Sequence, residues 1–227
     1  MPTILFTFLF GIFLGFKHAL EADHLTAVMT LVTEHKNSFR AALIGTFWGI
    51  GHTTTLFMVG LAVLILKINI PLRLGLGLES LVGIMLVILG IRALLKTEEL
   101  HEHAHEHGVS EHSHIHSDHR HHHQHKRSFL IGAVHGLAGS GALMVLVLST
   151  FRSIVEGVIY ILLFGMGSIV GMTAMSFLIG LPLTFAKSKL TRFNKLEMIL
   201  QKTAGTLSII LGLGIVYEIG FVNHLFF

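Results

Sequence analysis

Six long apolar segments dominate this chain and limit what it can fold into. A helix needs about 20 mostly apolar residues to cross the hydrocarbon core of a bilayer. In hydrocarbon the backbone must satisfy its own hydrogen bonds, and a helix does so. The sequence therefore predicts an all-α integral membrane protein with six transmembrane helices. The predicted helices cover Thr3–Val32, Phe39–Leu66, Leu74–Leu95, Ser128–Phe151, Ile154–Ala186 and Thr203–Phe227.

The composition excludes several classes of protein. Hydrophobic residues make up 52% of the chain and charged residues only 13%, which is too little polar surface to cover a soluble core. The chain has no cysteine, so it is neither a disulfide scaffold nor a thiolate metal protein. A formal net charge of +3 does not indicate a nucleic-acid partner, because membrane proteins carry an excess of basic residues on one side. We expect the lipid bilayer, and no nucleic acid, as a partner.

The basic residues predict the orientation of the chain in the membrane. One side carries only Lys67, Arg73 and Arg152. The other side carries twelve cations, and cytoplasmic loops are the ones enriched in Lys and Arg. We therefore expect a multi-pass protein of the cell membrane with both termini outside. The twelve are Lys36, Arg40, Arg92, Lys96, Arg120, Lys126, Arg127, Lys187, Lys189, Arg192, Lys195 and Lys202.

A histidine-rich stretch, Thr97–Arg127, separates the third and fourth apolar segments. It holds 12 of the 18 histidines of the chain. Such polar tracts bind divalent metal loosely and need not fold, so we expect a disordered cytoplasmic loop. The chain then divides into a first three-helix repeat (1–96), the loop (97–127) and a second three-helix repeat (128–227). A cytoplasmic metallochaperone is a candidate partner.

The two halves resemble each other weakly in sequence. Three pairs of segments align in order, with nearly constant offsets of 117, 116 and 122 residues. Because each half has three spans, the halves must be inverted in the membrane, and a 3+3 inverted repeat is typical of transporters, with the binding site at the repeat interface. The pairs are Gly15–His24 with Gly132–Gly141, Trp48–His52 with Phe164–Ser168, and Gly83–Ile91 with Gly205–Leu213.

Ionisable residues inside the apolar segments are few and concentrated. A charge at the bilayer centre costs roughly 2.5–3.5 kcal/mol on insertion scales, so these groups need partners or a cation. Imidazole with carboxylate suits Ni²⁺, Co²⁺ or Zn²⁺. A hydrogen-bonded cluster without metal is the alternative. The candidate metal ligands are His18, Glu21, Asp23, His24, His52 and His135, whereas Glu79 and Glu218, near the outer helix ends, are interpreted as interfacial.

Helix geometry adds a constraint to the first segment. At 100° per residue, a regular helix turns Asp23 about 140° away from His18. Either the first helix is locally distorted so that Asp23 and both histidines reach one ion, or Asp23 orients an imidazole on another helix. In either case we expect the ion between the first, second and fourth spans, with His52 donated from the second and lying within about 10 Å of His18 or His24.

The run His18-Ala19-Leu20-Glu21-Ala22-Asp23-His24 resembles the signature of the nickel/cobalt transporter family, a histidine followed after four residues by Asp-His. Gly51-His52-Thr53-Thr54 resembles the second motif of that family. Gly136–Gly141 in the fourth segment resembles the shorter branch associated with urease-accessory nickel permeases. The family commonly has Asp where this chain has Glu21. The resemblance implies a metal site built on the first two spans.

The resemblance implies a secondary permease for Ni²⁺ and Co²⁺, with uptake favoured over efflux and no cofactor beyond the transported ion. Nickel/cobalt efflux and Zn²⁺ transport are the alternatives. The chain has no G-x-x-x-x-G-K-[ST] motif, so it is not itself an ATPase, and no H-E-x-x-H motif within its apolar segments. Gly139-Ser140-Gly141 leaves an intramembrane serine hydrolase as a remote alternative, with His135 or His52 as base. A membrane-anchored metal sensor or buffer is the third hypothesis.

Overall fold

A computed structural model describes residues 2–33, 37–68, 70–99, 124–138, 151, 153–186 and 190–225. Within these ranges the chain is helical and contains no β-strand. Residues 124–138 form a helix. The other elements are α1 (Pro2–His18), α2 (Ala22–Val32), α3 (Ser38–Leu66), α4 (Leu72–Glu99), α6 (Ile154–Ala186), α7 (Leu190–Tyr217) and the π-helical turn η1 (Glu218–Val222).

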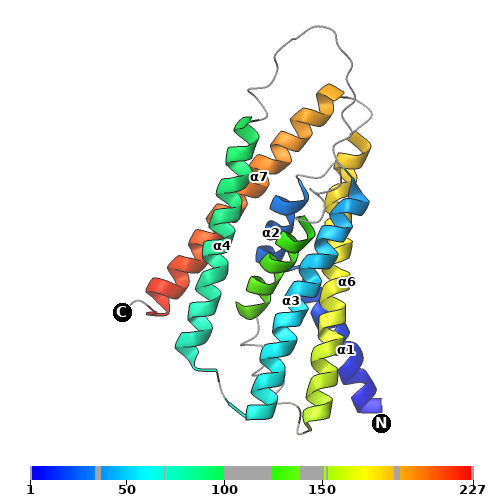
Figure 1. The fold of residues 1–227 in the computed structure, drawn as a ribbon, viewed down its shortest axis with the longest axis vertical. Helices are drawn as coiled ribbons and strands as arrows, with labels where there is room; N and C mark the ends of the chain where they lie inside the picture. The colour runs from blue at the N-terminus through cyan, green and yellow to red at the C-terminus, as the bar shows by residue number, and fades with distance from the viewer. Residues whose placement is uncertain are drawn as a thin grey trace.

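Successive helices run in alternating directions (Figure 1). We call the end that holds Leu66 and Leu72 the lower end, and the end that holds Ser38 and Glu99 the upper end. The α1–α2 pair rises from the lower end, α3 descends and α4 rises. The helix over 124–138 then descends, α6 rises and α7 descends. The start of α1 and the end of α7 therefore both lie toward the lower end.

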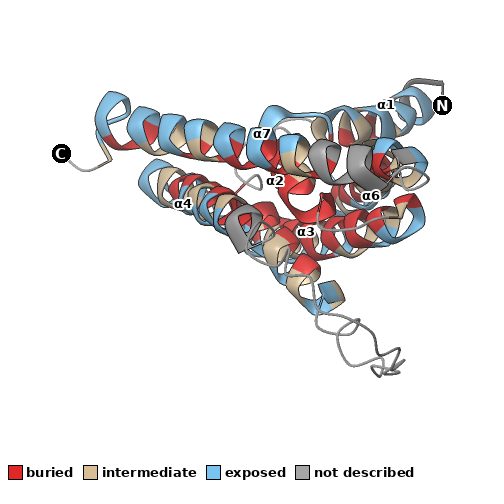
Figure 2. Ribbon diagram, turned by 90° about the horizontal axis from the view of Figure 1, so that it is seen from above, coloured by how far each residue is buried: buried red, intermediate tan, exposed pale blue. Residues whose placement is uncertain are grey.

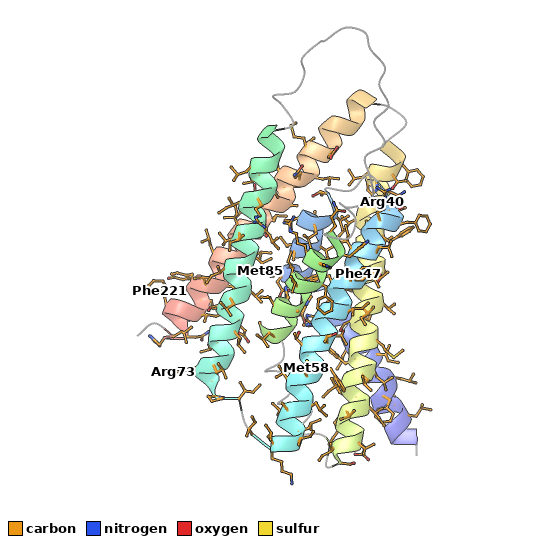
Figure 3. All side chains as sticks on the ribbon, viewed as in Figure 1. Arg40, Phe47, Met58, Arg73, Met85 and Phe221 are labelled. Carbon is orange, nitrogen blue, oxygen red and sulfur yellow. The ribbon has the colours of Figure 1, made fainter. Side chains whose placement is uncertain are left out.

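The helices have the length and surface of membrane-spanning elements. Four candidate spans are present in the described residues: Ser38–Leu66, Leu72–Leu95, Ile154–Phe185 and Glu197–Val222. Exposed residues lie on the outward faces of the helices and buried ones on the inward faces (Figure 2). The outward side chains include Met58, 65% exposed, and Phe221, 52% exposed (Figure 3). The predicted all-α integral membrane fold is confirmed.

Both ends of the histidine-rich stretch, which was predicted to be disordered throughout, are helical. Helix α4 continues to Glu99, and residues 124–127 are already helical. The predicted disorder over Thr97–Arg127 is therefore wrong at both ends. Glu and Lys are good helix formers, so the flanking helices continue past their apolar parts. Residues 100–123 lie outside the described part of the chain.

In the described part of the chain, the most extensive helix packing is within two pairs, α3 against α6 and α4 against α7. Glycines let these backbones approach closely, as is common for helices in membranes. A methyl group added at Gly90 would meet the carbonyl oxygen of Gly205, and one at Gly212 would meet that of Gly83. Between the pairs lies a buried core that includes Trp48.

Candidate metal centre

The first apolar segment is broken in the middle. Helix α1 ends at His18 and α2 begins at Ala22. The break is closed by short turns, in which the Leu20 N–H donates to the Lys17 carbonyl (2.9 Å) and the Glu21 N–H to the His18 carbonyl (3.0 Å). The predicted distortion of this helix is confirmed. It places His18 at the last turn of one helix and Asp23 and His24 in the first turn of the next.

Four imidazoles meet at this break, from α1, α2, α3 and the helix over 124–138. The centroid of the His24 ring lies 4.4 Å from that of His18, 4.1 Å from that of His135 and 5.1 Å from that of His52. The rings of His18 and His52 are 5.3 Å apart, so the predicted proximity of His52 to the first segment is confirmed. His24, His52 and His135 are at most 2% exposed.

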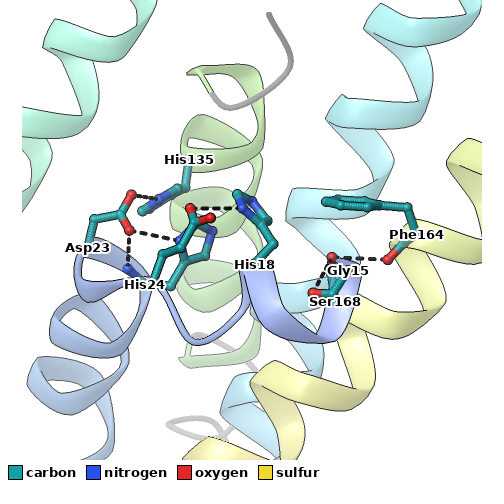
Figure 4. A network of polar contacts seen from close by, with 8 residues as sticks. Gly15, His18, Asp23, His24, His135, Phe164 and Ser168 are labelled. Carbon is teal, nitrogen blue, oxygen red and sulfur yellow. Dashed lines mark hydrogen bonds and ion pairs between the residues drawn. The ribbon is translucent and has the colours of Figure 1, made fainter. Parts of the chain in front are cut away.

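Two carboxylates hold three of these rings (Figure 4). Asp23 Oδ1 accepts a hydrogen bond from His24 Nδ1, and Asp23 Oδ2 accepts one from His135 Nε2, both at 3.0 Å. The backbone N–H of His24 also donates to Asp23 Oδ1 at 2.9 Å. Glu21 Oε2 lies 2.9 Å from His18 Nδ1. A carboxylate accepts, so the nitrogen facing it carries the proton.

The opposite nitrogens of these rings are consequently lone-pair donors. His18 Nε2, His24 Nε2 and His135 Nδ1 are buried without a hydrogen-bond partner, as are both nitrogens of His52. Leaving buried polar atoms unsatisfied costs about 1–3 kcal/mol each. Ligand atoms of His18, His24 and His52 lie within 4.8 Å of one another, as do those of Asp23, His24 and His135. Imidazole nitrogens suit borderline divalent ions such as Ni²⁺, Cu²⁺ and Zn²⁺.

The helix ends at the break also favour a cation. The last turn of α1, which carries His18, presents the negative end of that helix dipole to the cluster. The first turn of α2 presents a positive end, and the carboxylates of Glu21 and Asp23 stand there. Discontinuous helices whose ends face the bilayer midplane form cation sites in this way in transporters.

A cavity of about 530 Å³ opens beside the cluster. It is lined by the carboxylates of Glu21 and Asp23 and by three of the imidazoles. Glu79 of α4, Glu218, the first residue of η1, and Asn223 line the same cavity. Sequence reasoning interpreted the two glutamates as interfacial and missed that they face the same cavity as the histidines. Segments so distant in sequence carry no signal of that proximity.

The structure brings together all six predicted ligands, His18, Glu21, Asp23, His24, His52 and His135. It also adds an aromatic wall that sequence reasoning missed. The ring of Trp48 lies 5.5 Å from both His24 and His135, and that of Phe164 lies 5.4 Å from His18. Trp48 and Phe164 are a matched pair in the repeat predicted from the sequence, and that pairing was the available signal. The hydrolase candidates at 139–141 lie outside the described residues.

Comparisons with known proteins identify relatives over most of the chain. Residues 57–214 match the family described as the transmembrane region of cytochrome c biogenesis proteins. The urease accessory protein UreH of Bacillus sp. (strain TB-90) is 39% identical over 95% of this chain and 92% of its own length. A protein of Methanocaldococcus jannaschii named as a nickel/cobalt efflux system is 26% identical over 78% of this chain and 74% of its own length. No solved structure gives a significant match.

The fold, the cluster and these matches define an all-helical membrane protein of the transporter class. The chain belongs to the family of the urease accessory protein UreH, and residues 57–214 place it in the family described as the transmembrane region of cytochrome c biogenesis proteins. These relatives carry no enzyme names, in agreement with the prediction that the chain is not an enzyme. Thiol–disulfide exchange, in particular, is closed to its own side chains, because it contains no cysteine.

Proposed function

We propose that the protein is a secondary transporter that carries Ni²⁺, and also Co²⁺, across the cell membrane. The observation that carries the proposal is the group of four imidazoles at the broken first helix, each with a buried nitrogen that has no hydrogen-bond partner. No nucleotide-binding motif accompanies it, so transport depends on ion gradients rather than on ATP. Uptake is favoured over efflux because the more similar relative, at 39% identity, is the urease accessory protein.

The roles of the site residues follow from their contacts. His18, His24 and His52 supply the ligand nitrogens, because a ligand atom from each lies within 4.8 Å of the others and each ring has a buried nitrogen without a partner. Asp23 orients His24 and His135 and fixes which ring nitrogen is free, as carboxylates behind metal-binding histidines commonly do. Glu21 does the same for His18. Water completes the shell of the ion, which keeps binding reversible.

The proposal includes six spans arranged as a 3+3 inverted repeat. Close contacts that recur at matched positions support it. A methyl at Gly15 would meet the carbonyl oxygen of Phe164, and one at Gly132 would meet that of Trp48. Gly15 matches Gly132, and Trp48 matches Phe164, so the two contacts exchange under the repeat. The Gly83–Gly212 and Gly90–Gly205 contacts also exchange, under the 122-residue offset.

The proposed orientation places both termini outside and the histidine-rich loop in the cytoplasm. The alternating directions of the helices support it, since the start of α1 and the end of α7 lie toward the same end (Figure 1). The cationic residues Arg40 and Arg73 lie at opposite ends (Figure 3), and the end with Arg40 is the one rich in basic residues. Loosely held metal in the loop would then exchange with cytoplasmic carriers such as a metallochaperone.

The test is the accumulation of radioactive nickel at trace concentration by cells with and without the protein. We expect higher accumulation with the protein, and competition by Co²⁺. His24→Ala should reduce accumulation to the level of cells that lack the protein, since it removes a ligand shared by both candidate metal sets. The matched control is His224→Asn, an exposed histidine with φ of 54°, which Asn tolerates.

Three results would contradict the proposal. Unchanged accumulation in cells that make the protein would exclude nickel uptake, and lower accumulation would identify efflux. Normal transport by His24→Ala at equal membrane abundance would remove the imidazole cluster from the pathway.

A further inference from the structure

Two glutamates outside the imidazole cluster share its cavity. Glu79 lies on α4 and Glu218 at the start of η1, and both line the cavity together with His24 and His135. The glutamate side chains are exposed, whereas the two histidines are buried. The glutamates therefore stand at the accessible part of the cavity and the imidazoles at its closed part.

A carboxylate at either of these positions has a free-energy cost that a bound cation would offset. Both lie inside candidate spans, Leu72–Leu95 and Glu197–Val222, where a charge facing lipid costs several kcal/mol. Within the described residues, neither forms an ion pair or a side-chain hydrogen bond. A single cation, Lys17, lines the cavity with them, against the carboxylates of Glu21, Asp23, Glu79 and Glu218. The cavity is therefore strongly acidic.

The closed part of the cavity points independently to a cationic ligand. His24 and His135, 1% and 2% exposed, line it, and each has a ring nitrogen without a partner. A cation that enters from solvent can therefore meet the exposed glutamates before it reaches these buried nitrogens. The cavity thus combines exposed oxygen ligands with buried nitrogen ligands.

The internal repeat argues against a purely architectural role for Glu79. Under the 122-residue offset, Glu79 corresponds to Gln201, a neutral amide that is 2% exposed. The charge is therefore present in only one half, although the helices are equivalent. If the fold itself required a carboxylate at this position, both halves would carry one.

We infer that Glu79 and Glu218, together with Glu21, form a capture station for a hydrated divalent cation ahead of the imidazole cluster. The inference rests on the proposed transport function and adds a second, outer position to it. Carboxylate oxygens and retained water suit a divalent ion that has not yet lost its hydration shell. A cleft lined by one sign of charge also raises the local concentration of the oppositely charged ligand. The outer station therefore increases the rate of capture, and the imidazoles supply the tight binding.

The experiment compares the nickel dependence of initial uptake rates in the full-length protein and in Glu79→Gln, Glu218→Gln and the double variant. We expect the KM of the double variant to rise roughly 10-fold, in the range of electrostatic focusing, with the maximal rate retained. Added salt should lower subsaturating uptake by the unmodified protein more than by the double variant, because screening removes the same attraction. Glu79→Asp, which keeps the charge, should restore most of the capture.

The matched control is Glu156→Gln, in the first turn of α6 and outside the cavity lining. It removes an acid from the same end of the molecule and should leave KM unchanged. The inference is overturned if the double variant has the KM of the control, or if its maximal rate falls while KM stays constant at equal membrane abundance. Neither outcome contradicts nickel transport itself. If the proposed function were wrong, the unmodified protein would already show no uptake.

Discussion

Asp23 is the residue on which the geometry of the cluster depends most directly. One carboxylate accepts from His24 and from His135, and thereby joins α2 to the helix over 124–138. The ring N–H groups of His24 and His135 both point at the carboxylate, so the other nitrogen of each ring carries a free lone pair. Asp23 can therefore orient imidazoles on two helices without turning toward His18.

The substitution Asp23→Asn should weaken metal binding without removing a ligand nitrogen. The amide has one acceptor oxygen, and its NH₂ group faces one imidazole proton, so that ring must change tautomer or turn. We expect the apparent affinity for Ni²⁺ to fall about 10–100-fold, as for other carboxylates behind metal-binding histidines. Titration of the purified protein in detergent with Ni²⁺ measures this, with Glu156→Gln as control. An unchanged affinity would show that Asp23 does not orient the ligands.

At the scale of elements, the break between α1 and α2 and the close approach of α1 to α6 position the cluster. Ser168 Oγ donates to the carbonyl of Gly15 or to that of Phe164, both at 3.1 Å (Figure 4). Gly15 has no side chain, which lets α1 lie directly against the α6 backbone at Phe164. His18 follows one turn later and is thereby held at the level of His52.

Gly15→Ala should therefore separate α1 from α6 and disturb the site from a distance. Its methyl would meet the Phe164 carbonyl, which is backbone and cannot turn away. Overpacking of this kind costs about 1–3 kcal/mol, so we expect a lower melting temperature in detergent and reduced nickel uptake. The control is Gly214→Ala in α7, where a methyl meets nothing within 4 Å. That variant should melt at the same or a higher temperature, since Ala is the better helix former. Equal melting of the two variants would contradict the proposed contact.

At the scale of the whole molecule, the proposed topology places the two ends of α3 on opposite sides of the membrane. The absence of native cysteine makes this directly testable with single introduced cysteines. In intact cells, a membrane-impermeant maleimide should label Ile68→Cys, just below α3, and not Arg40→Cys, at its upper end. Permeabilised cells should give labelling at both positions. The opposite pattern would reverse the orientation, and labelling of both in intact cells would exclude α3 as a span.

Removal of the histidine-rich loop should separate metal capture in the cytoplasm from permeation. Deletion of residues 100–123 leaves α4 and the helix over 124–138 whole, and the entropy of closing a loop changes only slowly with its length. We expect less metal retained by the protein, with the uptake rate at saturating nickel preserved. The control is a loop of equal length in which every histidine is replaced by serine. Complete loss of uptake at saturating nickel would place the loop in the pathway.

The sequence by itself determined the class of structure and the chemistry of the site. Six apolar segments require helices, because hydrocarbon offers the backbone no other partners. The cost of charge in lipid singled out His18, Asp23, His24 and their companions, since such groups need a reason to be there. The angle between His18 and Asp23 predicted either a distorted first helix or an Asp23 that orients an imidazole on another helix, and the structure has both features.

Only the tertiary structure decided how these residues are used. Ala19, Leu20 and Glu21 are good helix formers, so local propensity does not mark the break; the contacts of the surrounding histidines with Glu21 and Asp23 accompany it instead. The pairing of Asp23 with His135 joins positions 112 residues apart, and Glu79 and Glu218 share a cavity only because α4 packs on α7. Such proximity arises from helix packing, which depends on the whole set of surfaces at once and leaves no trace in local sequence.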